Sequence, residues 1–402
     1  SIHQLDSAAQ WLQMTWMFFY DKKKWTQPRI RSFLKAVPDN KLILLDYYCD
    51  HTEIWRNTEK YYGNPYIWCY LGNFGGNTMI AGNLNDIDFK IKRLFKEGGD
   101  NVYGLGATLE GFDVNPLMYE FVFDQAWDYP VTTDQWITNW SMCRGGNQDA
   151  NIIKAWRALH QKIYTEHATC GQSVLMNARP RLTGTKSWNT NPGIHYANND
   201  LWQIWKELLK ARNINNSDFR FDVINIGRQV LGNLFSEYRD QFTACYNRKD
   251  TTGMREWSTR MDNLLLDLLS CDATLSIGKW LQDARNCGAT VSEKDYYEEN
   301  ARCILTVWGQ QDTQLNDYAN RGWGGLTRSF YRERWKRFTD GVIAAVSEDK
   351  PFDEDKFHQD ITQFEYNWTL QKDSFPIVSE EDPIQIADSL ILKYDTYFTK
   401  AQ

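Results

Sequence analysis

The sequence predicts two architectures in one chain: an α/β region over residues 1–129 and an all-α region over residues 130–402. In the first region, short apolar runs alternate with longer amphipathic stretches, which is the pattern of a parallel sheet buried on both faces. In the second, apolar residues recur at spacings of three and four, as in packed amphipathic helices. The length of 402 residues suits two domains, because single cores rarely exceed roughly 250–300 residues.

The α/β region contains apolar runs that we expect to form parallel strands, at residues 11–16, 42–46, 66–71 and 102–107. Amphipathic stretches at residues 28–36 and 87–95 predict crossover helices between them. These βα units are half of an eight-stranded barrel, or a small doubly wound sheet on their own. Each expected strand ends in polar or aromatic residues, and barrels keep their chemistry at that carboxyl edge.

The all-α region repeats the helical spacing along most of its length. Examples begin at Ile152, Leu201, Ile226 and Leu264. Residues 179–199 are rich in Gly, Pro and Asn, which predicts a long surface loop.

Composition excludes some functions and leaves others open. The net charge of −7 removes a bulk electrostatic case for binding nucleic acid, and no apolar run reaches the roughly 18 residues of a membrane span. Aromatic residues make up 15% of the chain, with 18 Trp and 21 Tyr. Such rings serve as stacking platforms for sugars, but they also fill large helical cores. The scattered cysteines include no CxxC pair, so no zinc site of that type is expected.

Motifs narrow the candidate chemistry. Gly104 and Gly106 resemble the start of a dinucleotide fingerprint, but Leu109 stands where the third glycine is required, so a nicotinamide or flavin site is excluded. Glu110 follows the strand at 102–107, where a carboxylate can be aimed at a substrate; the alternative is a surface-loop glutamate. Asp46, at the end of another strand, would orient a sugar hydroxyl or cap the next helix.

Two further segments carry groups suited to sugars. Asn73 and Asn77 bracket a glycine-rich stretch whose amides suit sugar hydroxyls or an acetamide. The segment from Trp308 to Tyr318 interrupts the helical pattern with aromatic and amide side chains. It is either part of a site or a buried turn between helices.

Together these blocks resemble glycoside hydrolase family 89, the α-N-acetylglucosaminidases. The resemblance is carried by NPYIWC at residues 64–69, NFGGN at 73–77 and GATLEG at 106–111. Further blocks follow in the same order along the chain: ARP at 178–180, LTVWG at 305–309, DYAN at 317–320 and YRERW at 331–335.

The resemblance implies a retaining exo-glycosidase that removes terminal α-linked N-acetylglucosamine from glycans such as heparan sulfate or mucin-type chains. Residues 1–129 would be the C-terminal half of a (β/α)8 barrel, and residues 130–402 an all-α domain contributing to the active-site pocket. Glu110 would be the catalytic nucleophile. The expected substrate-binding residues, from the resemblance and the motifs, are Trp16, Asp46, Tyr47, Asn73, Phe74, Trp308, Leu315 and Tyr318. No metal or organic cofactor is expected.

The chain departs from the family in one respect. A retaining mechanism needs a second carboxyl about 5–5.5 Å from the nucleophile. The family supplies it from an Asn-Glu pair upstream of the strand before Trp16, and that pair is not in this sequence. We expect the chain to be the C-terminal part of a longer enzyme, with the N-terminal domain and first half of the barrel as its partner. Alternatively, Asp46 or Asp50 has taken over the acid role.

Other functions are open on sequence alone. A non-catalytic carbohydrate-binding protein would keep the aromatic pocket without the acid, and a helical scaffold for protein partners would show a sizeable exposed apolar face. The opening residues Ser-Ile-His have no signal-peptide pattern. The resemblance nevertheless implies a secreted, periplasmic or lysosomal location.

Overall fold

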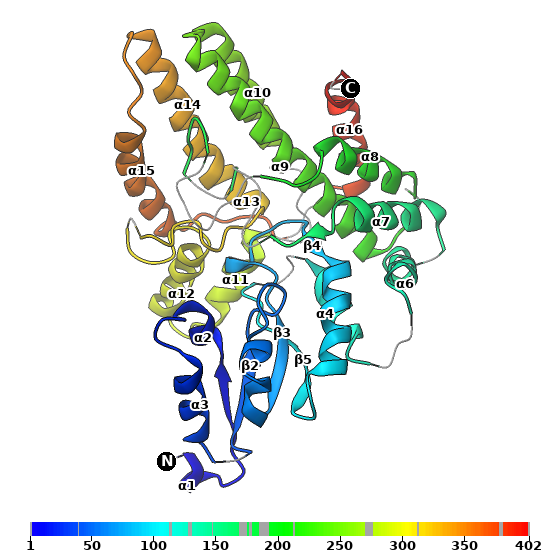
Figure 1. Cartoon of the computed structure of the whole chain (residues 1–402). Helices are drawn as coiled ribbons and strands as arrows, with labels where there is room; N and C mark the ends of the chain where they lie inside the picture. Colours follow the sequence, from blue (N-terminus) through cyan, green and yellow to red (C-terminus); the bar gives the residue numbers. More distant parts are fainter. Residues whose placement is uncertain are drawn as a thin grey trace. The chain divides into compact units, whose positions relative to one another are not determined.

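The computed structural model describes residues 2–38, 40–111, 115–127, 131–146, 148–168, 175–176, 179–184, 193–211, 214–269, 276–311, 313–377 and 381–400. These residues form two compact units. The sheet unit comprises residues 1–73, 81–136 and 164–167, and the helical unit comprises residues 74–80, 137–163 and 168–402. Figure 1 labels their helices and strands.

The sheet unit is built on a parallel sheet in the order β1-β2-β3-β5. Its strands are β1 (Trp11–Met14), β2 (Leu42–Asp46), β3 (Tyr66–Tyr70) and β5 (Val102–Ala107). The register pairs Trp11 with Leu42, Leu44 with Tyr66, and Cys69 with Gly106. The predicted parallel strands are therefore confirmed, and β2, β3 and β5 can be followed side by side in Figure 1.

The central and edge strands differ in burial. Leu44 on β2 and Trp68 on β3 are fully buried, whereas Leu12 and Met14 on β1 are 56% and 50% exposed. The expectation of a buried strand over residues 11–16 is thus wrong in two ways. First, the strand stops at Met14, and Trp16 begins the short helix α2 (Trp16–Tyr20). Second, the strand is exposed, because it lies at the edge of the described sheet.

Helices connect the strands as the sequence predicts, with one exception. α3 (Gln27–Lys35) precedes β2, and α4 (Leu84–Glu97) precedes β5. Asn83 caps α4 by accepting a hydrogen bond from the Asp86 backbone N–H at 3.0 Å. The β2–β3 connection instead uses two 3-10 turns, η1 (Ile54–Asn57) and η2 (Lys60–Gly63). The short strands β4 (Gly82–Asn83) and β6 (Thr165–Glu166) form an antiparallel pair, and α5 (Pro116–Asp124) follows β5.

The helical unit is built from the helices that the three- and four-residue spacing predicts. They include α7 (Ala150–Lys162), α8 (Asn198–Leu208), α9 (Ser217–Asn247), α10 (Thr251–Leu269), α11 (Ile277–Asn286), α12 (Val291–Ile304), α14 (Arg332–Ser347), α15 (Glu354–Thr369) and α16 (Pro383–Lys400). Caps fix several starts: Asn216 accepts from two amides of α9, and Thr290 with Glu293 forms a capping box on α12. The division between the units falls inside α6 (Thr133–Gly145). Of the loop expected at 179–199, residues 185–192 lie outside the described residues, residues 179–184 and 193–197 form no helix or strand, and α8 already begins at Asn198.

None of the described helices combines the length and apolar character that a membrane crossing requires.

Candidate functional site

The carboxyl ends of the sheet strands are joined by threonine side chains. Thr15, which follows β1, donates its hydroxyl to the Leu45 carbonyl at 2.9 Å and accepts from the Tyr47 backbone N–H at 3.2 Å. Thr108, which follows β5, donates its hydroxyl to the Tyr47 carbonyl at 2.7 Å. Its backbone N–H donates to the Tyr70 carbonyl at 3.0 Å. These bonds hold the post-strand segments against one another, so side chains from separate strands meet at one edge.

Tyr47 brings two of the predicted site residues together. Its ring meets the half-buried Trp16 edge to face, with centroids 5.7 Å apart. Burial raises the pKa of Tyr47, and the negative charge of Glu110 raises it further. Trp16, Tyr47 and Glu110, which belong to three different strand ends, therefore lie around one point of the carboxyl edge.

Glu110 is held at the end of the Thr108 segment. It lies two residues beyond Thr108 and is half-buried, so its carboxylate is neither sealed in the core nor fully in solvent. Its charge also contributes, after burial and Asp50, to a raised pKa of Tyr119 on α5. Tyr119 donates its hydroxyl to the Leu71 carbonyl at 2.7 Å. A half-buried carboxylate at a strand end can act as a nucleophile toward an electrophilic carbon.

Asp46 occupies a different environment from Glu110. It is fully buried, and its two carboxylate oxygens accept from the backbone N–H groups of Ile54 at 3.2 Å and Trp55 at 2.9 Å. Burial raises the pKa of Asp46 to about 6. The structure thus favours the capping alternative, here on η1, over the expected contact with a sugar hydroxyl.

Asp50 is likewise used by the backbone. It is fully buried, and its oxygens accept from the N–H groups of Leu71 and Gly72, each at 3.1 Å. This clamp fixes the segment leading into Asn73, which is itself buried. Asp46 and Asp50 therefore hold the backbone at the carboxyl edge in place from buried positions.

The helical unit holds three of the predicted aromatic site residues, Phe74, Trp308 and Tyr318. Trp308 and Tyr318 meet at 4.9 Å between ring centroids. The segment that begins at Phe74 packs closely on the same loop: a side chain at Gly75, whose φ is +70°, would come within 1.8 Å of the Tyr318 carbonyl oxygen. Arg321 donates to the Gly75 carbonyl at 3.0 Å. Leu315, also half-buried, accepts at its carbonyl from the Tyr318 N–H at 3.0 Å.

A buried ion-pair network supports this loop. Trp308 and Asp317 both adopt left-handed backbone, with φ of 59° and 61°. Asp317 is held by Arg334 at 2.8 Å, and Arg334 also pairs with Glu365 at 3.0 Å. All three side chains are buried, so the network fixes a conformation that the local backbone disfavours.

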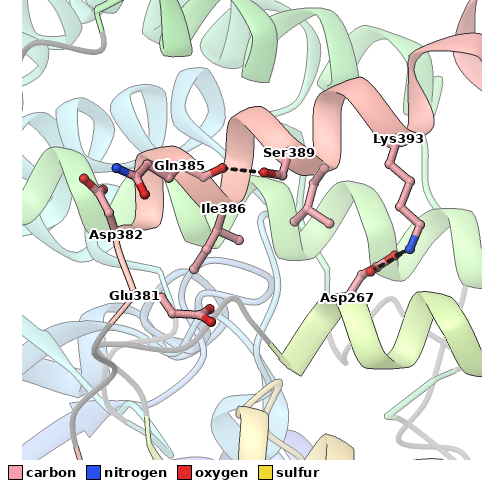
Figure 2. A pocket seen from close by; sticks show the side chains of 8 residues that line it. Asp267, Glu381, Asp382, Gln385, Ile386, Ser389 and Lys393 are labelled. Carbon is pink, nitrogen blue, oxygen red and sulfur yellow. Dashed lines mark hydrogen bonds and ion pairs between the residues drawn. The ribbon is translucent and has the colours of Figure 1, made fainter.

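A hollow lies elsewhere in the helical unit, away from the predicted site residues (Figure 2). It has a volume of about 720 Å³ and is lined by residues of α16, by Asp267, and by Glu381 and Asp382. Lys393 pairs with Asp267 at 2.7 Å, and Arg220 pairs with Asp382 at 2.9 Å. No predicted site residue lines this hollow, and its main charges are already paired.

Three residues that hold the carboxyl edge together were not predicted from the sequence. Thr15 and Tyr119 lie in no quoted motif, and Thr108 lies within the GATLEG block at residues 106–111 but was not singled out there. Position after a strand was a further signal for the two threonines; for Tyr119, on α5, there was none.

Comparisons with family models identify the protein family to which this chain belongs. The model described as the alpha-N-acetylglucosaminidase (NAGLU) tim-barrel domain matches residues 1–129. The model described as the alpha-N-acetylglucosaminidase (NAGLU) C-terminal domain matches residues 136–393. The chain belongs to the alpha-N-acetylglucosaminidase family, and the expected fold, part of a TIM-type barrel followed by a helical domain, is confirmed.

Individual relatives agree. The human protein alpha-N-acetylglucosaminidase is 29% identical over 97% of this chain and 53% of its own length. The CpGH89 protein of Clostridium perfringens, solved with its substrate GlcNAc-alpha-1,4-galactose, matches with a TM-score of 0.86 and 24% identity, over 98% of this chain and 45% of that one. The family 89 glycoside hydrolase from the same organism, in complex with 2-acetamido-1,2-dideoxynojirmycin, matches with a TM-score of 0.85 and 25% identity over the same shares. This chain spans about half the length of these relatives.

Proposed function

We propose that this chain is the nucleophile-bearing part of a retaining glycoside hydrolase that releases terminal α-linked N-acetylglucosamine from glycans. The observation that carries the proposal is the position of Glu110, half-buried at the carboxyl edge and beside Tyr47. Family membership supports the substrate class, since relatives are named for this activity or were solved with such a substrate. Heparan sulfate or mucin-type chains as the natural glycan stay a prediction.

In the proposed reaction, a Glu110 carboxylate oxygen attacks the anomeric carbon and forms a C–O bond while the glycosidic C–O bond breaks. A second carboxyl gives its proton to the leaving oxygen. It then removes a proton from a water molecule, which attacks the anomeric carbon and releases Glu110. Trp16 and Tyr47 of the sheet unit offer apolar ring faces for the sugar. The substrate-binding roles that the family resemblance implies for Phe74, Trp308 and Tyr318 of the helical unit stay predictions.

The second carboxyl is not provided by Asp46 or Asp50 in this proposal. Both are fully buried, and both use their two oxygens on backbone amides. We therefore propose that the acid/base glutamate comes from a preceding segment of a longer protein, as the family resemblance implies. The Clostridium substrate complex carries two Glu-to-Gln substitutions, which fits a mechanism with two glutamates.

The test uses an aryl α-N-acetylglucosaminide whose leaving group needs little acid assistance. We expect turnover by the wild-type protein, supplied with its preceding segment if the chain alone is inactive. Glu110→Gln should lower kcat at least about a thousandfold. Glu97→Gln, an exposed glutamate at the end of α4, is the matched control and should be unchanged. Full activity in Glu110→Gln would refute the assignment of the nucleophile. Sugar binding without turnover in every form would instead identify a carbohydrate-binding protein.

A further inference from the structure

A cluster of metal-binding side chains lies in the sheet unit and is not used by the proposed reaction. Asp50, His51 and His167 each offer one ligand atom, and these atoms all lie within 4.8 Å of one another. Asp50 and His51 belong to the turn after β2, and His167 follows β6. Residues separated widely in sequence thus converge on one point.

His51 supplies the most direct indication of a missing ligand. Its Nε2 atom is buried, and it has no hydrogen-bond partner among the described residues. The nearest carboxylate oxygen, Asp50 Oδ2, is 3.8 Å away, beyond hydrogen-bonding distance. Two ligands of a tetrahedral zinc ion lie roughly 3.4 Å apart, given Zn–N and Zn–O bonds of about 2.0–2.2 Å. To bind an ion between them, His51 Nε2 and Asp50 Oδ2 would therefore need to approach each other only slightly.

The surroundings already provide the outer contacts that metal-binding histidines use. His167 Nε2 lies 2.7 Å from Asp86 Oδ2, an orienting carboxylate of the kind that commonly supports a ligating imidazole. The His51 ring stacks on Tyr48 with centroids 4.5 Å apart, and Asp50 is fixed by the Leu71 and Gly72 amides. Each ligand is thus held in place before an ion arrives.

Charge also favours a cation. Asp50 and Asp86 bring two carboxylates to this point of the sheet unit, and the Lys90 ammonium pairs with Asp86 at 2.8 Å.

We propose that Asp50, His51 and His167 form a binding site for a divalent transition-metal ion of the zinc class. Two imidazole nitrogens and one carboxylate suit zinc or cobalt rather than calcium or magnesium, which prefer oxygen ligands. The proposed metal takes no part in the glycosidase reaction. The site is therefore tested by metal binding and not by activity. Occupancy would tie the turn after β2 to the segment after β6 and so stabilise the sheet unit.

The experiment is equilibrium titration of the purified protein with Zn²⁺ and with Co²⁺ at pH 7, followed by calorimetry and by the visible absorption of bound cobalt. We expect about one strong site per chain, a melting temperature that rises with zinc, and no displacement by excess Mg²⁺. His167→Gln and His51→Gln should each weaken zinc binding at least about tenfold. His160→Gln, on α7 of the helical unit, is the matched control and should bind as the wild type does.

Two ligand variants are used because one of them could fail to fold. Circular dichroism and the melting temperature without metal identify a variant that does not fold. Loss of zinc affinity in a folded His51 or His167 variant supports the site. Zinc affinity unchanged in both variants would overturn the proposal, as would equal loss in His160→Gln. Absence of a strong site in the wild type would overturn it too.

Discussion

The two units use their buried charges differently. In the helical unit, buried acids face buried bases: Arg334 joins Asp317 to Glu365, and Arg144 pairs with Asp222 at 2.6 Å. In the sheet unit the buried Glu53 also pairs with an arginine, Arg93. Asp46 and Asp50, however, accept from backbone amides instead of from a basic side chain. The first arrangement fastens helices and loops together, whereas the second shapes the chain at the ends of strands. Among the strand-end acids singled out from sequence, this leaves Glu110 as the one that is not fully buried.

The largest expected effect on stability comes from breaking the helical network. Arg334→Met leaves Asp317 and Glu365 buried without their shared cation, which should lower the free energy of unfolding by about 3–5 kcal/mol. Arg337→Met on the same helix removes an exposed i,i+4 pair with Glu333 and a cation–π contact with the Phe364 ring, and should cost about 1 kcal/mol. Urea unfolding of both variants measures the difference. Equal effects would show that the buried network does not stabilise the unit.

The clamp at Asp46 should appear as a dependence of stability on pH. Its pKa is about 6 in the folded chain, above the ordinary value of 3.8, so the folded state holds the proton more tightly than the unfolded state. The resulting stability is fully present below about pH 4 and is lost as pH rises through 6. Two pKa units correspond to on the order of 3 kcal/mol.

Asp46→Asn removes this titration. The stability of the wild type relative to Asp46→Asn should therefore fall by on the order of 3 kcal/mol between pH 4 and pH 7, as measured by urea unfolding. The exposed Asp100→Asn serves as the control. A pH-independent difference between the wild type and Asp46→Asn would contradict the raised pKa of Asp46.

A smaller effect is expected at Trp308, where a change in KM can be distinguished from a change in kcat. Trp308→Ala in the helical unit should raise KM about tenfold, a loss of roughly 1.4 kcal/mol, with little change in kcat, because it removes a ring face but no reacting group. Tyr296, an exposed ring on α12, provides the control through Tyr296→Ala. A fall in kcat with unchanged KM would instead place Trp308 close to the chemistry.

The smallest effect concerns the edge of the sheet. Leu12→Ser, on the exposed strand β1, should change the stability of this chain by less than about 0.5 kcal/mol. Leu44→Ala on the buried β2 should cost about 2–5 kcal/mol. If a preceding barrel segment covers β1, the cost of Leu12→Ser should rise in the longer protein. The same small cost in both forms would argue against that cover.

Much of the fold follows from local pattern. Apolar runs at 42–46 and 102–107 and the helical spacing after Ile152 predict elements that the structure contains. The end of β1 does not follow, because Trp16 and Phe19 continue an apolar run although the backbone turns helical at Trp16. Nor could the pattern place residues 74–80 in the helical unit, since that depends on Gly75 fitting against Tyr318.

The candidate site likewise has features that follow from local sequence pattern and features that depend on tertiary contacts. Position after a strand was enough to single out Glu110 and Asp46, and the family resemblance added Trp16 and Tyr47. Sequence could not decide which acid is buried, because that depends on the amides of Ile54 and Trp55 reaching back to Asp46.

The central claim is that Glu110 attacks the anomeric carbon. The direct measurement is the product formed by Glu110→Ala from an aryl α-N-acetylglucosaminide in the presence of azide, in a form of the protein whose wild type turns this substrate over. Azide would enter the space left by the carboxylate, form a C–N bond and expel the aryl oxide. The account predicts restored turnover and a glycosyl azide of β configuration. No rescue by azide, or an azide of α configuration, would contradict it.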